Sequence, residues 1–155
     1  MDDRTGALVA ELVAARDDFL AALDAVEPAR LAGQSLVGEW SARELIAHLG
    51  YWSGHVVEVI QAAERGATES FGVGRPSVDD INATVARVAR ETDLATAQAR
   101  ERASVEVLVD RLRTLDPTLL DLSLPDGATV EQRIREDGAE HYREHAYELR
   151  EAIGR

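Results

Sequence analysis

The chain has 155 residues, of which 45% are apolar and 30% are charged, a composition typical of one soluble domain that spans residues 1–155. It contains no cysteine, and arginine supplies all 17 of its cationic side chains, so disulfides, thiolate metal ligands and a Schiff-base lysine are excluded. The net charge of −12 argues against nucleic acid as a partner, because phosphate neutralisation needs a basic surface. No apolar run approaches the ~18 residues that cross a membrane, and the acidic start lacks a signal-peptide pattern, so we expect a cytoplasmic protein with no membrane partner.

The first forty residues predict one long helix followed by a loop. Apolar residues recur at helical spacing from Leu8 to Leu23 with charged residues between them, which predicts a helix over residues 3–25. Proline and glycine then interrupt the pattern over residues 26–40. We expect a loop there, with a single turn at Pro28–Leu31.

A capping box marks the start of the second predicted helix. The Ser41 hydroxyl is placed to accept a hydrogen bond from the amide of Glu44, whose side chain reaches back to the amide of Ser41. An apolar stripe continues from there to Gly66, which is a plausible stop for the helix. A second loop is predicted from Gly66 to Pro76.

The third helical pattern is unusually long. It opens at Ser77 and continues to Leu115, further than an ordinary globular helix extends. Thr92 and Asp93 are able to cap a new start, so a kink or break is expected there if the pattern is not continuous.

The last helix is predicted over residues 130–153, and it completes a set of four long amphipathic segments. No strand pattern accompanies them, so we expect an all-α fold, a four-helix bundle. The loops between the first three helices are longer than an up-and-down bundle requires, which allows at least one crossover.

The four histidines fall on two of these helices. Four residues advance a helix by about 400°, so His141 and His145 lie on one face of the last helix, at the spacing with which two imidazoles bind one metal ion. His48 lies within the apolar stripe of the second helix and points toward the core, where facing helices of a bundle build metal sites. Three neutral imidazoles would leave a coordination position open, as catalytic sites do, and they suit Zn, Ni, Fe or Cu.

Several neighbouring residues have competing interpretations. His55 lies two turns beyond His48, about 10 Å along the helix, and is not expected to share the ion. The histidines themselves have an alternative as ordinary core or surface residues without a ligand. Asp137 is expected to be a solvated acid rather than a hydrogen-bond partner of a ligand imidazole. Arg75 is expected to be a surface residue that pairs with acidic side chains. The alternative is that it binds an anionic substrate.

Three segments resemble the DinB/YfiT-like superfamily. Residues 39–52 resemble a segment of that superfamily in which a tryptophan and a serine or threonine are followed by an acidic residue, a histidine-leucine pair and a second tryptophan. Residues 77–82 resemble the opening of its third helix, and residues 137–145 resemble the motif of its last helix. The resemblance implies a four-helix bundle of up-down-down-up type and a divalent-metal site held by His48, His141 and His145. Relatives include thiol-dependent transferases and isomerases such as mycothiol-dependent maleylpyruvate isomerase.

Two functions from different classes remain open. One is a metal-dependent, thiol-dependent transferase or hydrolase that acts on a small electrophilic substrate, with Zn, Ni or Fe in the site. A low-molecular-weight thiol would then have to be a cosubstrate, because the chain has no cysteine. The alternative is a non-catalytic small-molecule-binding or stress-response bundle with a structural or vestigial metal. A homodimer is compatible with either function.

Overall fold

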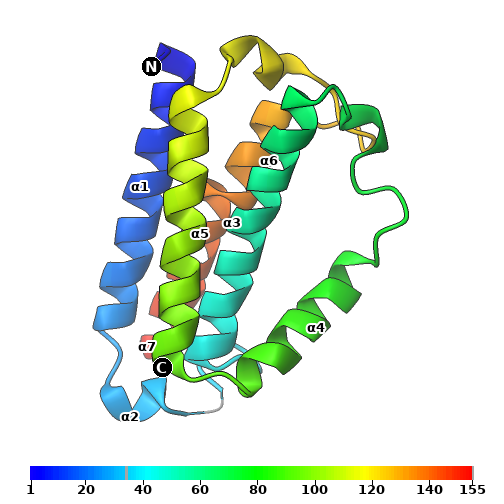
Figure 1. Cartoon of the computed structure of the whole chain (residues 1–155). Coiled ribbons are helices and arrows are strands. Elements are labelled where there is room, and N and C mark those ends of the chain that lie inside the picture. The colour runs from blue at the N-terminus through cyan, green and yellow to red at the C-terminus, as the bar shows by residue number, and fades with distance from the viewer. Residues whose placement is uncertain (34, 155) are drawn as a thin grey trace.

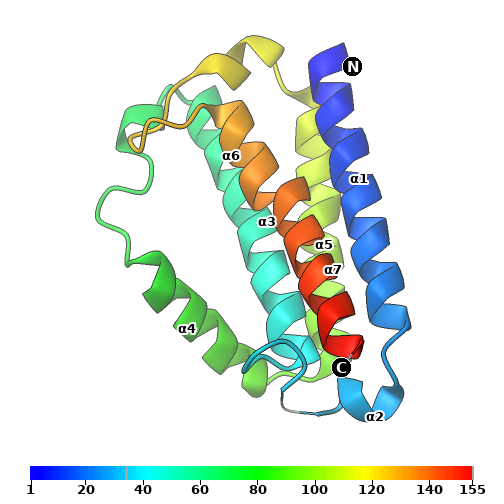
Figure 2. The same cartoon turned by 180° about the vertical axis from the view of Figure 1, so that it is seen from behind.

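The protein is a four-helix bundle in a computed structural model that describes residues 1–33 and 35–154 (Figures 1 and 2). The first and last helices of the bundle run in one direction and the middle two run in the other, which confirms the predicted all-α fold of up-down-down-up type. Within the described ranges no strand forms beyond two isolated bridges. The bundle consists of α1 (Asp3–Asp24), α3 (Ala42–Glu64), α5 (Leu94–Thr114), and α6 (Val130–Asp137) followed by α7 (Ala139–Ile153).

Shorter elements occupy the predicted loops. The single turn expected after the first helix is α2 (Pro28–Leu31), whereas the part of that loop at Gln34 lies outside the described residues. The 3₁₀ turn η1 (Thr68–Ser70) lies in the second loop, and η2 (Pro117–Asp121) precedes α6.

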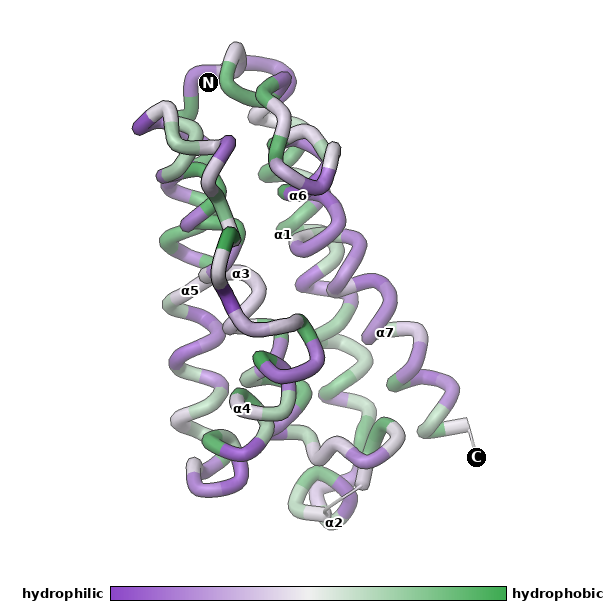
Figure 3. The backbone as a smooth tube through the Cα atoms, turned by 90° about the vertical axis from the view of Figure 1, so that its right-hand side faces the viewer, coloured by the Kyte–Doolittle hydropathy of each residue, from purple (hydrophilic) through white to green (hydrophobic). Residues whose placement is uncertain are grey.

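The long third pattern is divided where Thr92 and Asp93 allowed a break. Asp93 caps α5 by accepting a hydrogen bond from the amide of Thr96 at 2.7 Å. The preceding helix, α4 (Val78–Arg90), leaves the bundle and packs mainly on α3. Figure 3 looks onto α4 and its preceding loop, which lie in front of the bundle between α5 and α7. The indole of Trp52 on α3 ties α4 in place by donating to the side-chain oxygen of Asn82 at 2.9 Å.

The last predicted helix is not continuous, which corrects the expectation of one helix over 130–153. Gly138 separates α6 from α7 with φ −102° and ψ −108°. A Cβ at Gly138 would lie 2.4 Å from the carbonyl oxygen of Ile134, so only glycine fits this join. The join starts a new helix three residues before His141 and therefore sets the direction of the segment that carries two histidines.

A polar network lies inside the apolar core. Arg16 on α1 donates to both carboxylate oxygens of Glu101 on α5, at 2.7 Å each, and the hydroxyl of Tyr142 on α7 donates to the same carboxylate at 2.5 Å. Glu101 is buried, and the backbone of α3 comes close to it at Gly50, where a Cβ would lie 3.0 Å from the Cα of Glu101. The network therefore joins three helices of the bundle at one depth.

Hydrophilic residues dominate α6 and the first turns of α7, whereas hydrophobic residues are more frequent in α3 (Figure 3). The polar segment carries the acidic and basic residues that face the candidate site described below. Across residues 1–33 and 35–154, no helix combines the length and the apolar character that crossing a membrane requires.

Candidate metal centre and cavity

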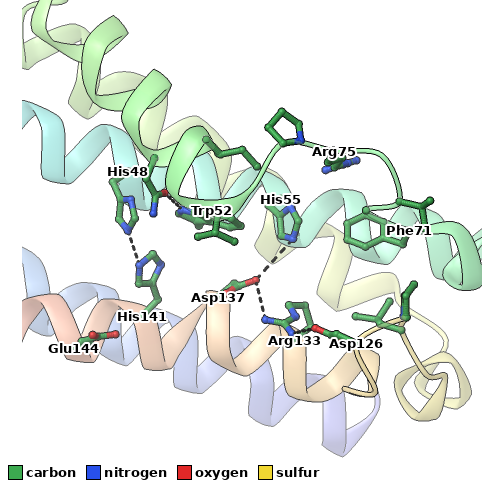
Figure 4. A pocket seen from close by; sticks show the side chains of 18 of the residues that line it. His48, Trp52, His55, Phe71, Arg75, Asp126, Arg133, Asp137, His141 and Glu144 are labelled. Atoms are coloured by element: carbon green, nitrogen blue, oxygen red, sulfur yellow. Dashed lines mark hydrogen bonds and ion pairs between the residues drawn. The ribbon is translucent and has the colours of Figure 1, made fainter.

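Three histidines from two helices meet in the interior. His48 lies in the second turn of α3, after the capping box of Ser41 and Glu44, which forms as predicted. His141 and His145 lie one turn apart on α7 and face α3 across the bundle. We call these three histidines the three-His cluster. Figure 4 shows His48 and His141 pointing toward one another.

The Nε2 atoms of the three-His cluster converge on one point. The Nε2 of His141 lies 2.8 Å from that of His48 and 3.0 Å from that of His145. One ring nitrogen from each residue lies within 4.8 Å of those of the other two, which meets the separation expected for a shared ion. His48 and His145 are buried, and His141 is partly buried. The arrangement is therefore a group that could hold a metal ion.

Burial keeps two of these imidazoles neutral. Desolvation, followed by the repulsion of a proton charge by His141 and His145, lowers the pKa of His48 from 6.5 to about 3. Desolvation, followed by the charge of His145, lowers the pKa of His141 to about 4. A neutral imidazole offers the lone pair that a metal ion requires. Both residues are thus in the ligand form across the neutral pH range.

The third imidazole has a carboxylate that orients it. The Nδ1 of His145 lies 2.9 Å from Oε2 of Glu148, one turn further along α7. When Nδ1–H donates to this carboxylate, Nε2 is left with its lone pair facing the other two histidines. Glu148 was not singled out from the sequence, although its i+3 spacing from His145 is a signal that would have identified it.

Trp40 covers the three-His cluster from the loop before α3. Its ring centroid lies 4.4 Å from that of His48 and 6.2 Å from that of His145. It also lines the cavity beside the cluster. It therefore shields one side of the cluster from water.

A cavity of about 740 Å³ opens from the three-His cluster and is walled by α3, α4, α6, α7 and the loops around them. A volume of this size holds a small organic molecule. We call the end of the cavity remote from the three-His cluster the distal end (Figure 4). It is lined by His55, Phe71, Arg75, Asp126, Arg133 and Asp137.

His55 lies apart from the three-His cluster, as its position two turns beyond His48 indicated. Its Nε2 faces Oδ2 of Asp137 at 3.9 Å instead. Desolvation, followed by the charge of Arg75, lowers the pKa of His55 to about 4. His55 is therefore a neutral imidazole in the cavity wall.

Asp137 differs from the solvated acid that we expected. Its side chain is only 19% exposed, with Oδ2 3.7 Å from Nη1 of Arg133. Burial raises the pKa of this carboxyl from 3.8 to about 6, although the charge of Arg133 opposes the shift. Asp137 lines the same cavity as residues of α4, so it faces this cavity rather than bulk solvent. Sequence periodicity gives no information on such a cavity.

Two other residues near the cavity have partners of their own. Tyr142, which directly follows His141, points away from the three-His cluster and into the polar network. Arg75 lines the cavity, but its guanidinium pairs with Glu58 at 2.7 Å, so it is already partnered by a carboxylate.

The fold and this cavity define a helical bundle with a histidine cluster in the wall of a small-molecule-sized cavity. The chain belongs to the DinB superfamily, whose family model matches residues 11–148. No functionally curated protein matches the sequence significantly.

Two solved structures share the fold. One is the crystal structure of an uncharacterised protein from Escherichia coli UTI89, with a TM-score of 0.80, 16% sequence identity, and coverage of 97% of this chain and 92% of that chain. The other is the crystal structure of the colibactin self-resistance protein ClbS in complex with a dsDNA, with a TM-score of 0.74, 15% identity, and coverage of 97% and 96%. A protein of this fold has thus been crystallised with DNA. For the present chain, the net charge of −12 led us to expect no nucleic acid as a partner.

Proposed function

We propose that the three-His cluster binds a divalent metal ion and that the protein is a metal-dependent transferase or hydrolase acting on a small electrophilic substrate in the adjoining cavity. The observation that carries this proposal is the convergence of three Nε2 atoms at the wall of a cavity of about 740 Å³. Neutral histidines suit Zn, Ni or Fe.

The donor set fits such an ion. Three nitrogens at ~2.0–2.1 Å from a tetrahedral ion lie about 3.3 Å from one another. The observed separations of 2.8 Å and 3.0 Å are shorter by a few tenths of an ångström, which small rotations of the imidazole rings would supply. No carboxylate belongs to the group among the described residues, so the site would be all-imidazole with an open position toward the cavity.

The residues around the three-His cluster have distinct roles in the proposed reaction. A bound divalent ion supplies a Lewis acid that lowers the pKa of a water or a thiol. Because the chain has no cysteine, a thiol nucleophile would come from a low-molecular-weight cosubstrate. Glu148 holds His145 in the ligand tautomer, and Trp40 excludes water from one side of the cluster. The cavity holds the electrophile beside the cluster and limits its size.

Metal content tests the binding step. Purified wild-type protein is expected to retain a stoichiometric divalent ion, whereas His141→Ala loses it. His55→Gln is the matched control, because His55 is a neutral histidine of the same cavity that lies outside the three-His cluster. An equal loss of metal in both variants, or a wild-type protein that binds no metal, would refute the site.

Turnover tests the catalytic step. Metal-loaded wild-type protein is assayed with mycothiol or bacillithiol and a set of electrophiles, and with each electrophile in water alone. We expect conjugation or hydrolysis that stops in chelator and in His141→Ala, and that returns when metal is added back to the wild type. A metal-loaded protein that is inactive toward every pair would count against an enzyme of this class.

The likeness to ClbS favours a second candidate, a non-catalytic binding protein with a protective role. That neighbour is described as a self-resistance protein in complex with dsDNA. For the present chain the net charge of −12 weighs against duplex DNA, because binding must neutralise phosphates. A duplex-binding titration at two salt concentrations separates the candidates. Tight binding that weakens steeply with salt would support the second, and its absence would leave the enzyme proposal in place.

A further inference from the structure

The distal end of the cavity presents the carboxylate of Asp137, which accepts no side-chain hydrogen bond from the described residues. Asp137 is 19% exposed, and its Oδ2 lies 3.7 Å from Nη1 of Arg133 and 3.9 Å from Nε2 of the neutral His55. Both distances exceed the length of a hydrogen bond. A largely buried carboxylate without a donor is costly, so a donor from another molecule is favourable there. Figure 4 shows Asp137 between the three-His cluster and His55.

His55 has unused capacity as well. Its Nδ1 is buried and has no hydrogen-bond partner among the described residues, and its Nε2 reaches no closer than 3.9 Å to Asp137. The imidazole is neutral, so one of its nitrogens is a hydrogen-bond acceptor. When the single ring proton is on Nδ1, the Nε2 that faces the gap is an acceptor. The gap then has an acceptor on each side, which suits a group with several N–H or O–H donors.

The charges around this gap favour a cation. Arg75 pairs with Glu58 at 2.7 Å and stacks on Phe71 at 4.9 Å, so its guanidinium is engaged outside the gap. The guanidinium of Arg133 binds Asp126, and its Nη1 lies 3.1 Å from a second carboxylate, that of Glu136. Arg75 is thus neutralised by a carboxylate outside the gap. Arg133 is shared between Asp126, Glu136 and, at 3.7 Å, Asp137. An anionic group would meet Asp137 without a free arginine to balance it.

We propose that Asp137 and His55 bind the protonated primary amine of the molecule that occupies the cavity. An ammonium group carries three donors and a positive charge, which match the carboxylate and the acceptor nitrogen on the two sides of the gap. The aromatic rings of Trp52 and His55 pack together beside it at 4.9 Å and supply an apolar wall for the carbon chain that carries the amine.

The amine subsite implies a substrate class for the proposed function. The link between this subsite and the three-His cluster rests on that proposed function. His55 lies seven positions after His48 on α3, which is about 10 Å along a helix. The substrate is therefore an elongated molecule with its reactive thiol or electrophilic group at one end, an apolar middle and an amine about 10 Å away.

The amine preference is tested on metal-free wild-type protein, so that it does not depend on the metal. Hexylammonium, 1-hexanol and hexanoate are titrated at pH 8, with calorimetry and tryptophan fluorescence as readouts. We expect hexylammonium to bind at least about tenfold more tightly than 1-hexanol, as a charge-assisted hydrogen bond allows, and hexanoate to bind least. Equal binding of the three molecules, or preference for hexanoate, would overturn the proposal.

Two variants locate the preference. Asp137→Asn is expected to weaken hexylammonium binding at least about tenfold and to leave 1-hexanol unchanged. The matched control is Glu136→Gln, which removes a carboxylate that pairs with the same Arg133 but lies outside the cavity lining. Circular dichroism checks that both variants fold. An equal loss in both would show a long-range charge effect and overturn the subsite. If Asp137→Asn does not fold, the wild-type ligand series still decides the proposal.

The failure of this proposal is distinguishable from the failure of the proposed function. A protein that binds no metal but still selects hexylammonium through Asp137 would keep the amine subsite and refute the metal centre. A protein that binds metal at the three-His cluster but does not select the amine would do the reverse.

Discussion

The hydroxyl of Tyr142 donates a 2.5 Å hydrogen bond to the buried carboxylate of Glu101, while the preceding residue, His141, faces the cavity. Burial, followed by the charge of Glu101, raises the pKa of Tyr142 well above its usual value, so the hydroxyl remains a donor. Arg16 holds both oxygens of the same carboxylate. The helix that supplies two histidines is therefore anchored from behind by a buried polar network.

Replacing Tyr142 with phenylalanine tests what this anchor does. Tyr142→Phe leaves the buried carboxylate of Glu101 with one donor fewer, and we expect the free energy of unfolding in urea to fall by about 1–3 kcal/mol. Metal content of the folded variant should stay unchanged, because Arg16 still holds Glu101. Tyr147→Phe is the control, since Tyr147 is 66% exposed. Metal loss from folded Tyr142→Phe would instead show that the network sets the geometry of the three-His cluster.

Gly138 is expected to be intolerant of any side chain. In Gly138→Ala the new Cβ would lie 2.4 Å from the carbonyl oxygen of Ile134, so the join between α6 and α7 must shift. We expect a loss of about 1–3 kcal/mol in unfolding free energy, together with weaker metal binding because α7 is displaced.

The control for that substitution is Gly54→Ala in the middle of α3. A Cβ at Gly54 meets nothing within 4 Å outside its own helix backbone, so helix propensity should raise stability by up to about 1 kcal/mol. Urea unfolding of both variants makes the comparison. A Gly138→Ala protein as stable as the wild type would show that the join adapts freely.

The three-His cluster was predictable because it depends on two regular features. Helical spacing places His141 and His145 on one face, and the apolar stripe that contains His48 turns that residue inward. The opposite directions of the two helices then bring those faces together. The break at Thr92 and Asp93 was predictable for a similar local reason, namely the capping side chain.

The distal end of the cavity was not predictable from the same signals. Asp137 lines a cavity that α4 helps to wall, and the apolar pattern of α4 runs on into α5 without showing that the two helices separate. Phe71 reaches the cavity from a loop whose path is set by tertiary contacts. The division of the last helix at Gly138 likewise depends on a backbone join that hydrophobic spacing does not reveal.

Glu148 should influence metal affinity without touching the metal. Glu148→Gln replaces the carboxylate that accepts from Nδ1–H of His145 with a neutral amide. We expect metal affinity to fall roughly 10- to 100-fold, with little change in the unfolding of the metal-free protein. Competition with a chromophoric chelator measures the affinity. Glu144→Gln, on the same helix, is the control, and an equal loss there would trace the effect to net charge rather than to the hydrogen bond.

The stability of the metal-free protein should depend on pH through its buried histidines. The folded-state pKa values of His48, about 3, and of His55 and His141, about 4, lie below the ordinary value of 6.5. The unfolded chain therefore takes up protons that the folded chain does not. Their contribution to stability is fully present above about pH 6.5 and is lost as the pH falls toward 4, by up to about 1.4 kcal/mol per pH unit for each histidine.

Asp137 has the opposite effect on the pH dependence of stability and reduces the net dependence. Its folded-state pKa of about 6 lies above 3.8, so the folded chain holds its proton more tightly between these values and offsets one of the three histidines. Urea unfolding in chelator from pH 4 to pH 8 should therefore show stability rising with pH up to about 6.5, with a steeper rise in Asp137→Asn. Replacing His141 with alanine should flatten the curve of unfolding free energy against pH.

The metal-loaded protein should keep its ion to a lower pH than unperturbed imidazoles would allow. Protons compete with the metal for His48 and His141 only near pH 4, well below the window from about pH 7 to 5 that unperturbed imidazoles give. Dialysis at stepped pH followed by metal analysis checks this, and release of the ion already between pH 7 and 6 would contradict it.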